Sequence, residues 1–313
     1  MTQDRAAQPS AAQPALVWAA LLTVYVLWGS TYLAIRVAVA TMPPLLMAGS
    51  RFALAGLILL AWRLPIALRA GKSPTLDQWR RALVIGAALL LGGNGAVAFA
   101  ETTVPSGLTA LIVSTVPLWM TAIDALFYKR APSRAALVGL ATGFGGVALL
   151  IGRPGGDWVS IVGATVLVLG SLSWAAGSIY SRTAKLPDDS LLSTGMEMFA
   201  GGVCLLIASL AARENVGFHL ASVSQASWIG FWWLVFFGGI VGFAAYLWVI
   251  RNAPTSLVST YAYVNPVVAV ALGWAILHEQ ITVGTLVAGG TIIASVALIV
   301  SSVARQRVEA DAA

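Results

Sequence analysis

Charged residues, cysteine and histidine are all scarce in this sequence. Asp, Glu, Lys and Arg make up only 10% of the 313 residues, whereas a soluble domain carries about 25%, so the chain is not built for water. The single cysteine, Cys204, excludes a disulfide framework and a thiolate zinc cluster. The two histidines, His219 and His278, are too few and too far apart to hold a metal ion. We therefore expect no metal and no other cofactor.

Long apolar runs dominate what is present, because 59% of the residues are hydrophobic. A helix that crosses a membrane needs about 20 mostly apolar residues. The sequence therefore predicts an all-α integral membrane protein in contact with the lipid bilayer, without a cleavable signal peptide, since its first residues are polar. Ten runs are long enough to span, at 15–38, 45–62, 82–100, 104–127, 134–152, 158–180, 190–212, 228–250, 255–277 and 282–303.

The basic residues are distributed unequally between the connectors. Cytoplasmic loops hold the excess of Lys and Arg. If the N-terminus is inside, only Arg36, Arg153 and Arg213 face outward. The residues that then face the cytoplasm are Arg5, Arg63, Arg69, Lys72, Arg80, Arg81, Lys129, Arg130, Arg134, Arg182, Lys185, Arg251, Arg305 and Arg307. This asymmetry predicts that both termini are cytoplasmic. Because the basic residues lie between apolar runs and form no patch, we expect no nucleic-acid partner.

The chain contains an internal repeat. A shift of 146 residues places Trp28 on Trp174 and Arg36 on Arg182, and a shift of 149 residues places Pro105 on Pro254 and Pro117 on Pro266. These matches predict two five-helix repeats, 15–152 and 158–303, between an N-terminal tail, 1–14, and a C-terminal tail, 304–313. Since five is odd, the second repeat enters the membrane inverted. Inverted repeats are typical of transporters, whose substrate site lies where the copies meet.

Several short motifs match one family over nearly the whole chain. They are Trp28 to Thr31, Arg51-Phe52, Pro105 to Leu108, Asn265-Pro266 and His278-Glu279. With these motifs the chain resembles EamA-type members of the drug/metabolite transporter superfamily. The resemblance implies two five-helix repeats in a bacterial inner membrane and export of amino acids or related metabolites, with aromatic amino-acid exporters and threonine/homoserine exporters as the nearest functional models. One departure is Arg130, which stands in the first copy where the second has Glu279 and where family members often have Glu.

Polar and aromatic residues inside the runs are the candidate substrate contacts. Asn265 lies near mid-depth and shares a helix face with Tyr261. An interhelical hydrogen bond is an equally good interpretation of Asn265, and an interfacial position also suits Trp174. An aromatic stripe with hydroxyl groups suits an amphipathic ligand. The predicted cavity set is Tyr25, Trp28, Tyr32, Asn94, Ser171, Trp174, Tyr261 and Asn265.

Two prolines and four charged residues complete the candidate set. Pro117 and Pro266 each lack a backbone donor and bend their helices, either for packing or as hinges beside the cavity. Intramembrane charge calls for a functional hypothesis, so Arg51 is a candidate for gating or for attracting a substrate carboxylate. The copies are inverted, which places Arg51 and the equivalent Glu197 at different depths, so no salt bridge is expected between them. The proton-carrier candidates are Glu197 and Asp124, and Glu101 shares with Asn94 a face that leads to the outer mouth or caps a helix end.

A carrier that exports small amphipathic metabolites, amino acids above all, by alternating access fits these features best. We expect a monomer that binds a small-molecule substrate. Because the sequence places no acidic residue at the midplane, it favours a facilitator driven by the substrate gradient. A proton-coupled antiporter is the alternative. An intramembrane enzyme would need a Ser–His pair or a carboxylate dyad, and an open channel would need charged rings; the sequence favours neither.

Overall fold

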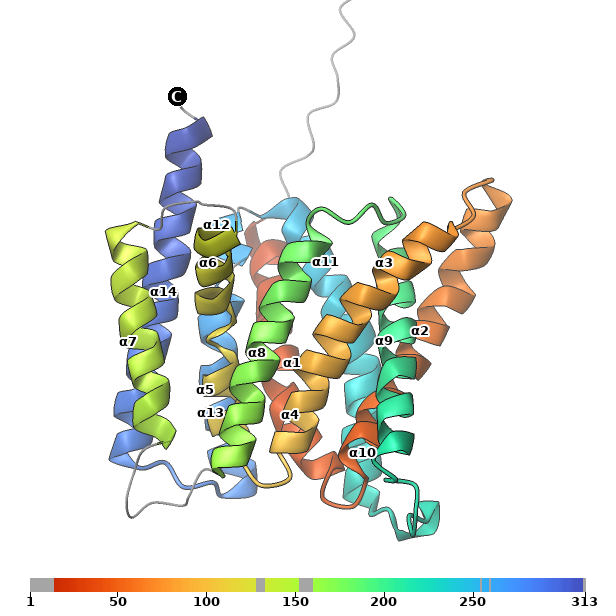
Figure 1. Cartoon of the computed structure of the whole chain (residues 1–313), viewed down its shortest axis with the longest axis horizontal. Helices are drawn as coiled ribbons and strands as arrows, with labels where there is room; N and C mark the ends of the chain where they lie inside the picture. The colour runs from red at the N-terminus through yellow and green to blue at the C-terminus, as the bar shows by residue number, and fades with distance from the viewer. Residues whose placement is uncertain (1–13, 128–132, 152–159, 254, 259, 312–313) are drawn as a thin grey trace, which may run out of the picture.

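The computed structural model describes residues 14–127, 133–151, 160–253, 255–258 and 260–311. Every regular element in these ranges is a helix, and the helices stand side by side in an upright bundle (Figure 1). The predicted N-terminal tail falls almost entirely outside the described ranges, as does Arg130, whereas most of the predicted C-terminal tail continues α14 as helix to Asp311. The first half contains α1 (Pro14–Ala38), α2 (Pro44–Arg69), α3 (Leu76–Gly86), η1 (Ala87–Asn94), α4 (Gly95–Ala100), α5 (Ser106–Val113), α6 (Val116–Phe127) and α7 (Arg134–Ile151).

The second half repeats this order with small differences. It contains α8 (Ile161–Ser181), α9 (Ser190–Ala211), η2 (Leu220–Ser222), α10 (Gln225–Trp233), η3 (Leu234–Val241), α11 (Gly242–Asn252), α12 (Thr255–Val258), α13 (Tyr261–Leu277) and α14 (Val283–Asp311). In the described part of the chain, 8 helices are long and apolar enough to cross a membrane, and two more, Arg134–Leu150 and Tyr261–Leu277, are apolar but shorter. An all-α membrane protein is confirmed.

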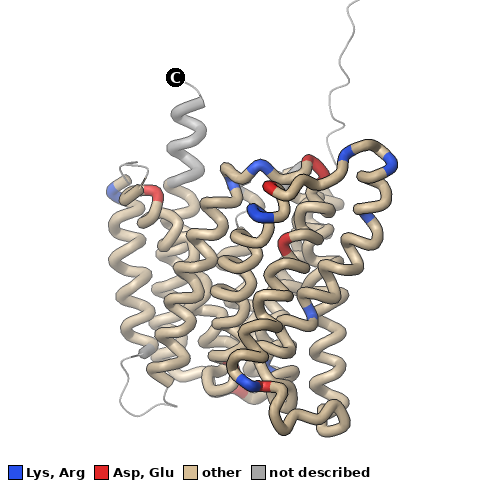
Figure 2. The backbone as a smooth tube through the Cα atoms, turned by 45° about the vertical axis from the view of Figure 1, so that its right-hand side comes forward, with Lys and Arg blue, Asp and Glu red and all other residues tan. Residues whose placement is uncertain are grey.

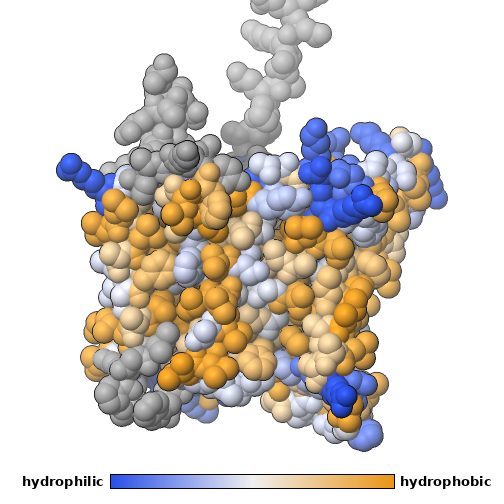
Figure 3. All heavy atoms as spheres, in the orientation of Figure 1, coloured by the Kyte–Doolittle hydropathy of each residue, from blue (hydrophilic) through white to orange (hydrophobic). Residues whose placement is uncertain are grey.

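The surface separates into charged ends and an apolar middle. Lys and Arg gather mainly at the end where α1 begins and α14 ends, the upper end in Figure 2. Apolar residues cover the body of the bundle between the ends (Figure 3). Large hydrophobic side chains such as Trp62, Leu126 and Phe127 point outward there. An apolar belt of this size is unusual for a soluble protein and suits contact with lipid.

Several helix ends in this bundle are capped by side chains, because the first amides of a helix have no partner within it. Thr75 and Gln78 form a reciprocal capping box at the start of α3, with hydrogen bonds of 3.2 and 2.9 Å. The α2 helix is capped from another element: Glu214, which follows α9, accepts from the amides of Leu45 and Leu46 at 3.2 and 2.8 Å. This cap ties the second helix of the first half to the second helix of the other half.

The two halves meet closely where α2 crosses α9. A Cβ atom on Gly56 would lie 2.9 Å from the carbonyl oxygen of Gly195, and a Cβ on Gly202 would lie 3.0 Å from that of Gly49. Only glycine permits this backbone approach, as in other tightly packed membrane helices. The same shift of 146 residues that defines the repeat relates both pairs, so the two contacts are reciprocal.

Candidate functional site

An aromatic cluster on α1, α11 and α13 surrounds Trp28. Its ring centroid lies 4.8 Å from that of Tyr246, 5.4 Å from that of Tyr261 and 6.1 Å from that of Phe243. The Trp28 Nε1 donates to the carbonyl oxygen of Gly238 in η3 at 3.3 Å. Two members of the predicted cavity set, Trp28 and Tyr261, are therefore brought together edge to face. Phe243 and Tyr246 were not in the predicted set, although their spacing of three residues places them on one helix face.

Polar groups lie beside this aromatic cluster. The hydroxyl groups of Tyr25 and Thr260 are hydrogen-bonded across α1 and the start of α13. The α13 helix lies directly against Gly29, where a Cβ would come within 3.1 Å of the Asn265 carbonyl oxygen. The Asn265 side chain is buried, and its Oδ1 has no hydrogen-bond partner among the described residues. A buried acceptor left unsatisfied costs about 1–3 kcal/mol, so Asn265 offers an unused acceptor at the α1–α13 contact.

A second group of residues, the buried polar cluster, consists of Tyr32, Arg36, Arg51, Asn94 and Glu101. Arg51 is 4% exposed, and its Nη2 donates to Asn94 Oδ1 at 3.0 Å. Its Nε has no partner in the described ranges. Arg36, at the end of α1, donates to the main-chain carbonyl oxygen of Glu101. Tyr32 connects the two groups, because it is close enough to Glu101 and to Tyr261 to interact electrostatically with both.

Glu101 occupies the short connector between α4 and α5 and is fully buried. Burial raises the pKa of this carboxyl well above its ordinary value, and the nearby negative charge of Glu279 raises it further. Arg36 and Arg51 lower the pKa of Glu101 by attraction, but the net shift is upward. A carboxyl in these surroundings favours its neutral, protonated form.

A surface pocket opens beside the buried polar cluster. Its volume is about 540 Å³, and its lining includes Arg36 from α1, Ala40 just after α1, Thr102, Pro105 and Glu279. Thr102 is the direct chain neighbour of Glu101. The pocket therefore reaches the chain neighbour of Glu101, while the Glu101 side chain itself stays buried.

Glu279, which lines the pocket, caps a helix with its carboxylate. Its Oε1 accepts from the Ser106 amide at 2.7 Å and from the Ser106 hydroxyl at 2.8 Å. Its Oε2 accepts from the Gly107 amide at 3.0 Å. It thereby caps the first turn of α5 from the far end of α13, as Glu214 caps α2.

The predicted residues on α8 lie elsewhere. Ser171 is buried and donates to the carbonyl oxygen of Leu167 within its own helix at 2.8 Å. Trp174 packs against Gly93 of η1, where a Cβ would lie 2.6 Å from its ring. The structure therefore does not bring Ser171 and Trp174 to the aromatic cluster, and α8 packs on η1, α4, α5 and α6.

The remaining charged candidates, Asp124 and Glu197, lie toward the end of the bundle away from the pocket. Asp124 in α6 forms an ion pair with Arg182 at the end of α8, at 3.8 Å. Glu197 is half-buried in α9, and among the described ion pairs none joins it to Arg51. Pro117 follows an interruption between α5 and α6, whereas α13 runs unbroken through Pro266.

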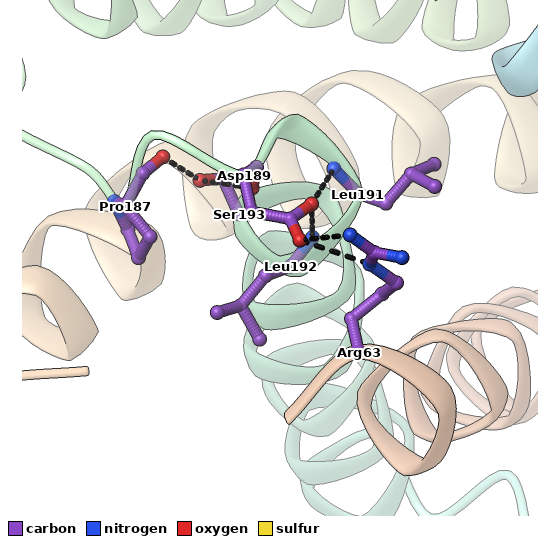
Figure 4. A network of polar contacts seen from close by, with 6 residues as sticks. All are labelled: Arg63, Pro187, Asp189, Leu191, Leu192 and Ser193. Carbon is purple, nitrogen blue, oxygen red and sulfur yellow. Dashed lines mark hydrogen bonds and ion pairs between the residues drawn. The ribbon is translucent and has the colours of Figure 1, made fainter. Parts of the chain in front are cut away.

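An ion pair between α2 and α9, which the sequence analysis did not predict, also lies at this end of the bundle. Arg63 Nη2 and Nε lie 2.5 and 2.9 Å from Asp189 Oδ2 (Figure 4). Asp189 Oδ1 also caps α9 by accepting from the amides of Leu191 and Leu192 at 3.1 and 3.2 Å. Partial burial acts to raise the pKa of Asp189, but these bonds outweigh it and hold the pKa below its ordinary value.

Two π-helical segments were also not expected from the sequence. The segments η1 and η3 each have 8 residues and carry Gly92-Gly93 and Gly238-Gly239 at positions related by the repeat shift of 146. Trp174 packs on Gly93, and the equivalent Trp28 bonds to Gly238, so each segment contacts the first helix of the other half. Segments of π-helix occur frequently at functional sites. The Gly-Gly pair shared by the two repeats was the sequence feature that could have indicated these segments.

A helical bundle with an apolar belt, an aromatic cluster and buried charges between two related halves defines a membrane transporter. The model of the EamA-like transporter family matches residues 14–152 and 161–301. The chain therefore belongs to the EamA-like transporter family and is a multi-pass protein of the inner membrane.

Named relatives agree with this assignment. The chain is 40% identical over 287 residues, 90% of each chain, to YedA of Escherichia coli K12, described as an uncharacterized inner membrane transporter. It is 24% identical to a probable amino-acid metabolite efflux pump of Salmonella typhimurium, over 87% of this chain and 90% of that protein. A protein of known crystal structure shares the fold with a TM-score of 0.59, at 20% identity, over 93% of this chain and 98% of that chain.

Proposed function

We propose that this transporter exports small amphipathic metabolites, with amino acids as the substrate class, by alternating access as a monomer. The Salmonella relative is named for amino-acid metabolite efflux, which supports the class. The single observation that carries the proposal is the aromatic cluster around Trp28 beside the unpartnered amide oxygen of Asn265. Flat rings and an orienting polar group suit an amphipathic ligand.

The proposed architecture has ten spans in two inverted five-helix repeats, 15–152 and 158–303, with cytoplasmic tails at 1–14 and 304–313. The two shorter apolar helices supply the ninth and tenth spans. Reciprocal glycine contacts between α2 and α9 are what a two-fold relation between halves would produce. The basic residues near the start of α1 and the end of α14 (Figure 2) support a cytoplasmic position for that end.

Within this architecture most of the predicted residues have a proposed role. The aromatic cluster, together with Tyr25, Tyr32 and Asn265, contacts the substrate, while Arg51 and Asn94 attract its carboxylate. Trp174 and Ser171 occupy the matching position in the other half, and Pro117 and Pro266 flank the moving segments. A facilitator driven by the substrate gradient and a proton-coupled antiporter both fit this site. They differ in whether protons move with the substrate.

The substrate class is tested by a resistance screen in a bacterial strain that overexpresses the protein. Protection against toxic aromatic amino-acid analogues, but not against threonine-like ones, is the expected result. Radiolabelled counterflow in proteoliposomes then tests the carrier mechanism. Saturating counterflow supports a carrier, whereas flux that never saturates would replace the carrier with a channel.

A further inference from the structure

Three glutamates gather at the end of the bundle opposite the termini, and one of them differs from the others. Glu214 accepts three hydrogen bonds, from the Leu45 and Leu46 amides and from Ser209 Oγ. Glu279 also accepts three, from two groups of Ser106 and from the Gly107 amide. Glu101 is fully buried, and neither of its carboxylate oxygens has a hydrogen-bond partner in the described part of the chain.

The positively charged neighbours of Glu101 form their hydrogen bonds with atoms other than its carboxylate oxygens. Arg36 from α1 donates to the Glu101 main-chain oxygen, and Arg51 from α2 donates to Asn94. Among the described residues neither guanidinium forms an ion pair with the Glu101 carboxylate. The other titratable groups that face it are Tyr32 of α1 and Glu279 beyond α13. An ionised carboxylate would draw a guanidinium into a charge-assisted bond, so this geometry matches a neutral carboxyl.

We propose that Glu101 is a proton-binding site that couples proton uptake to export. A proton is the ligand that fits, because a carboxyl with no exposed surface leaves no room for a larger cation. The pocket lined by Arg36, Thr102 and Glu279 supplies the proton from the side opposite the termini. This inference rests on the proposed function, and it selects the antiporter over the facilitator.

The coupling follows from competition for Arg51. With Glu101 protonated, Arg51 bonds to Asn94, and Arg36 bonds to the main chain, as observed. When Glu101 gives up its proton, the carboxylate attracts both guanidinium groups, and the bond between Arg51 and Asn94 at the end of η1 is broken. Tyr32 is near enough to both Glu101 and Tyr261 to interact electrostatically with each, and through it the change in charge acts on the aromatic cluster. Glu101 takes up its proton from the pocket and releases it toward the end of the bundle that holds the termini, so one proton moves inward for each substrate that moves outward.

Infrared difference spectroscopy of the purified full-length protein tests the proton site without any substrate. The spectrum between acidic and alkaline buffer should contain the C=O band of a protonated carboxyl that titrates above the ordinary pKa of Glu, about 4.3. This band should disappear in E101Q and shift but persist in E101D, which keeps a titratable group. The matched control E214Q, whose parent carboxylate is fully hydrogen-bonded, should retain it. A band unchanged in E101Q, or no band in the wild type, would overturn the proposal.

Proteoliposomes that contain a pH-sensitive dye test the coupling, with tryptophan and threonine as the probes. Wild-type protein should move protons against the amino-acid flux, whereas E101Q should exchange labelled for unlabelled amino acid but move no protons. Amino-acid transport without proton movement in the wild type would overturn this inference and leave the proposed export intact. If neither amino acid is transported, the proposed substrate class fails, and the infrared titration still decides the role of Glu101.

Discussion

At the scale of single residues, Trp28 is both part of the packed interior and part of the proposed substrate site. It contacts three aromatic rings of the other half and donates to the main chain of η3. Burying an aromatic side chain among others contributes about 3–5 kcal/mol when judged by truncation to alanine. Much of that cost applies to folding, so a transport assay on a Trp28 variant has to be paired with a stability assay.

Replacing Trp28 with alanine should abolish amino-acid counterflow, because the substrate loses the central ring of the aromatic cluster. The variant should still insert and elute as a monodisperse species, with a lower melting temperature. The matched control is Trp18→Ala on the same helix, because Trp18 is 51% exposed on the apolar surface. Wild-type counterflow in Trp28→Ala would remove the aromatic cluster from the substrate site.

A variant of Asn265 can distinguish a role in substrate binding from a role in stability. If its amide held the bundle together, Asn265→Ala would lower stability by about 0.6 kcal/mol or more. Because its Oδ1 is buried with no partner among the described residues, we expect Asn265→Ala to leave the melting temperature unchanged or raised while transport is lost. Asn252→Ala, which removes an exposed amide bonded within its own helix, is the control and should transport normally. A destabilised variant that still transports would contradict a substrate contact.

Sequence patterns were sufficient for some residues and insufficient for others, and the difference is physical. Tyr261 and Asn265 were found because helical periodicity places side chains on one face. Phe243 and Tyr246 were missed because their contact with Trp28 joins distant segments, and periodicity within one helix carries no information about that pairing. Glu101 was expected at an outer mouth or a helix end. Its complete burial depends on how α1, α2 and α4 pack around it.

At the scale of elements, apolar runs locate the helices but not their interruptions. The run at 104–127 is divided at Ser114 and Thr115 into α5 and α6, and the run at 255–277 begins with the separate turn α12. The run at 45–62 continues as helix to Arg69, past Pro65. The π-helical segments could not be derived from an apolar run, because a π-turn changes which residues share a face without changing the composition.

The crossing of α2 and α9 makes a prediction at this scale. Gly56→Ala and Gly202→Ala should each lower the thermal stability, by about 1–3 kcal/mol, because the added methyl group meets backbone atoms of the facing helix. Gly145→Ala is the control, since a Cβ at that position meets nothing within 4 Å. Melting curves in detergent measure the difference. Equal stability for all three variants would argue against close contact at the crossing.

The ion pair between α2 and α9 should make stability depend on pH. The pKa of Asp189 is lower in the folded protein, so its contribution is fully present above the unfolded value of about 3.9 and is lost as the pH falls through the folded value. Both side chains are partly exposed, at 25% and 28%, so the pair contributes under about 1 kcal/mol.

Two variants separate the ion pair from the helix cap. Asp189→Asn keeps a good capping residue and removes only the charge, whereas Asp189→Ala also removes the cap, which costs about 1 kcal/mol more. We expect the melting temperature at neutral pH to fall in the order wild type, Asn variant, Ala variant. The difference between wild type and the Asn variant should shrink in acid. A constant difference at all pH values would show that the charge of Asp189 is not involved.

At the scale of the whole molecule, the arrangement of halves and ends decides how the chain lies in the membrane. The reciprocal contacts of α2 with α9, and of each π-helical segment with the first helix of the other half, are what the proposed inverted repeats would produce. The two ends of the bundle are also chemically different. One holds the ion pairs Arg63–Asp189 and Asp124–Arg182, and the other holds the buried Glu101 and the pocket, so a proton and a substrate meet unlike surfaces on the two sides.

This asymmetry predicts which loops are reachable from outside the cell. Ser73, between α2 and α3, and Val216, after α9, are both exposed and lie at opposite ends of the bundle. With the native thiol removed by Cys204→Ala, a membrane-impermeant maleimide should label Val216→Cys in intact cells. It should label Ser73→Cys only after the membrane is permeabilised, because the proposed arrangement places the Lys- and Arg-rich end in the cytoplasm. Labelling of both positions from one side would exclude the proposed ten-span arrangement. The reverse pattern would keep the spans but place Glu101 and its pocket on the cytoplasmic side, and the proton would then have to enter from there.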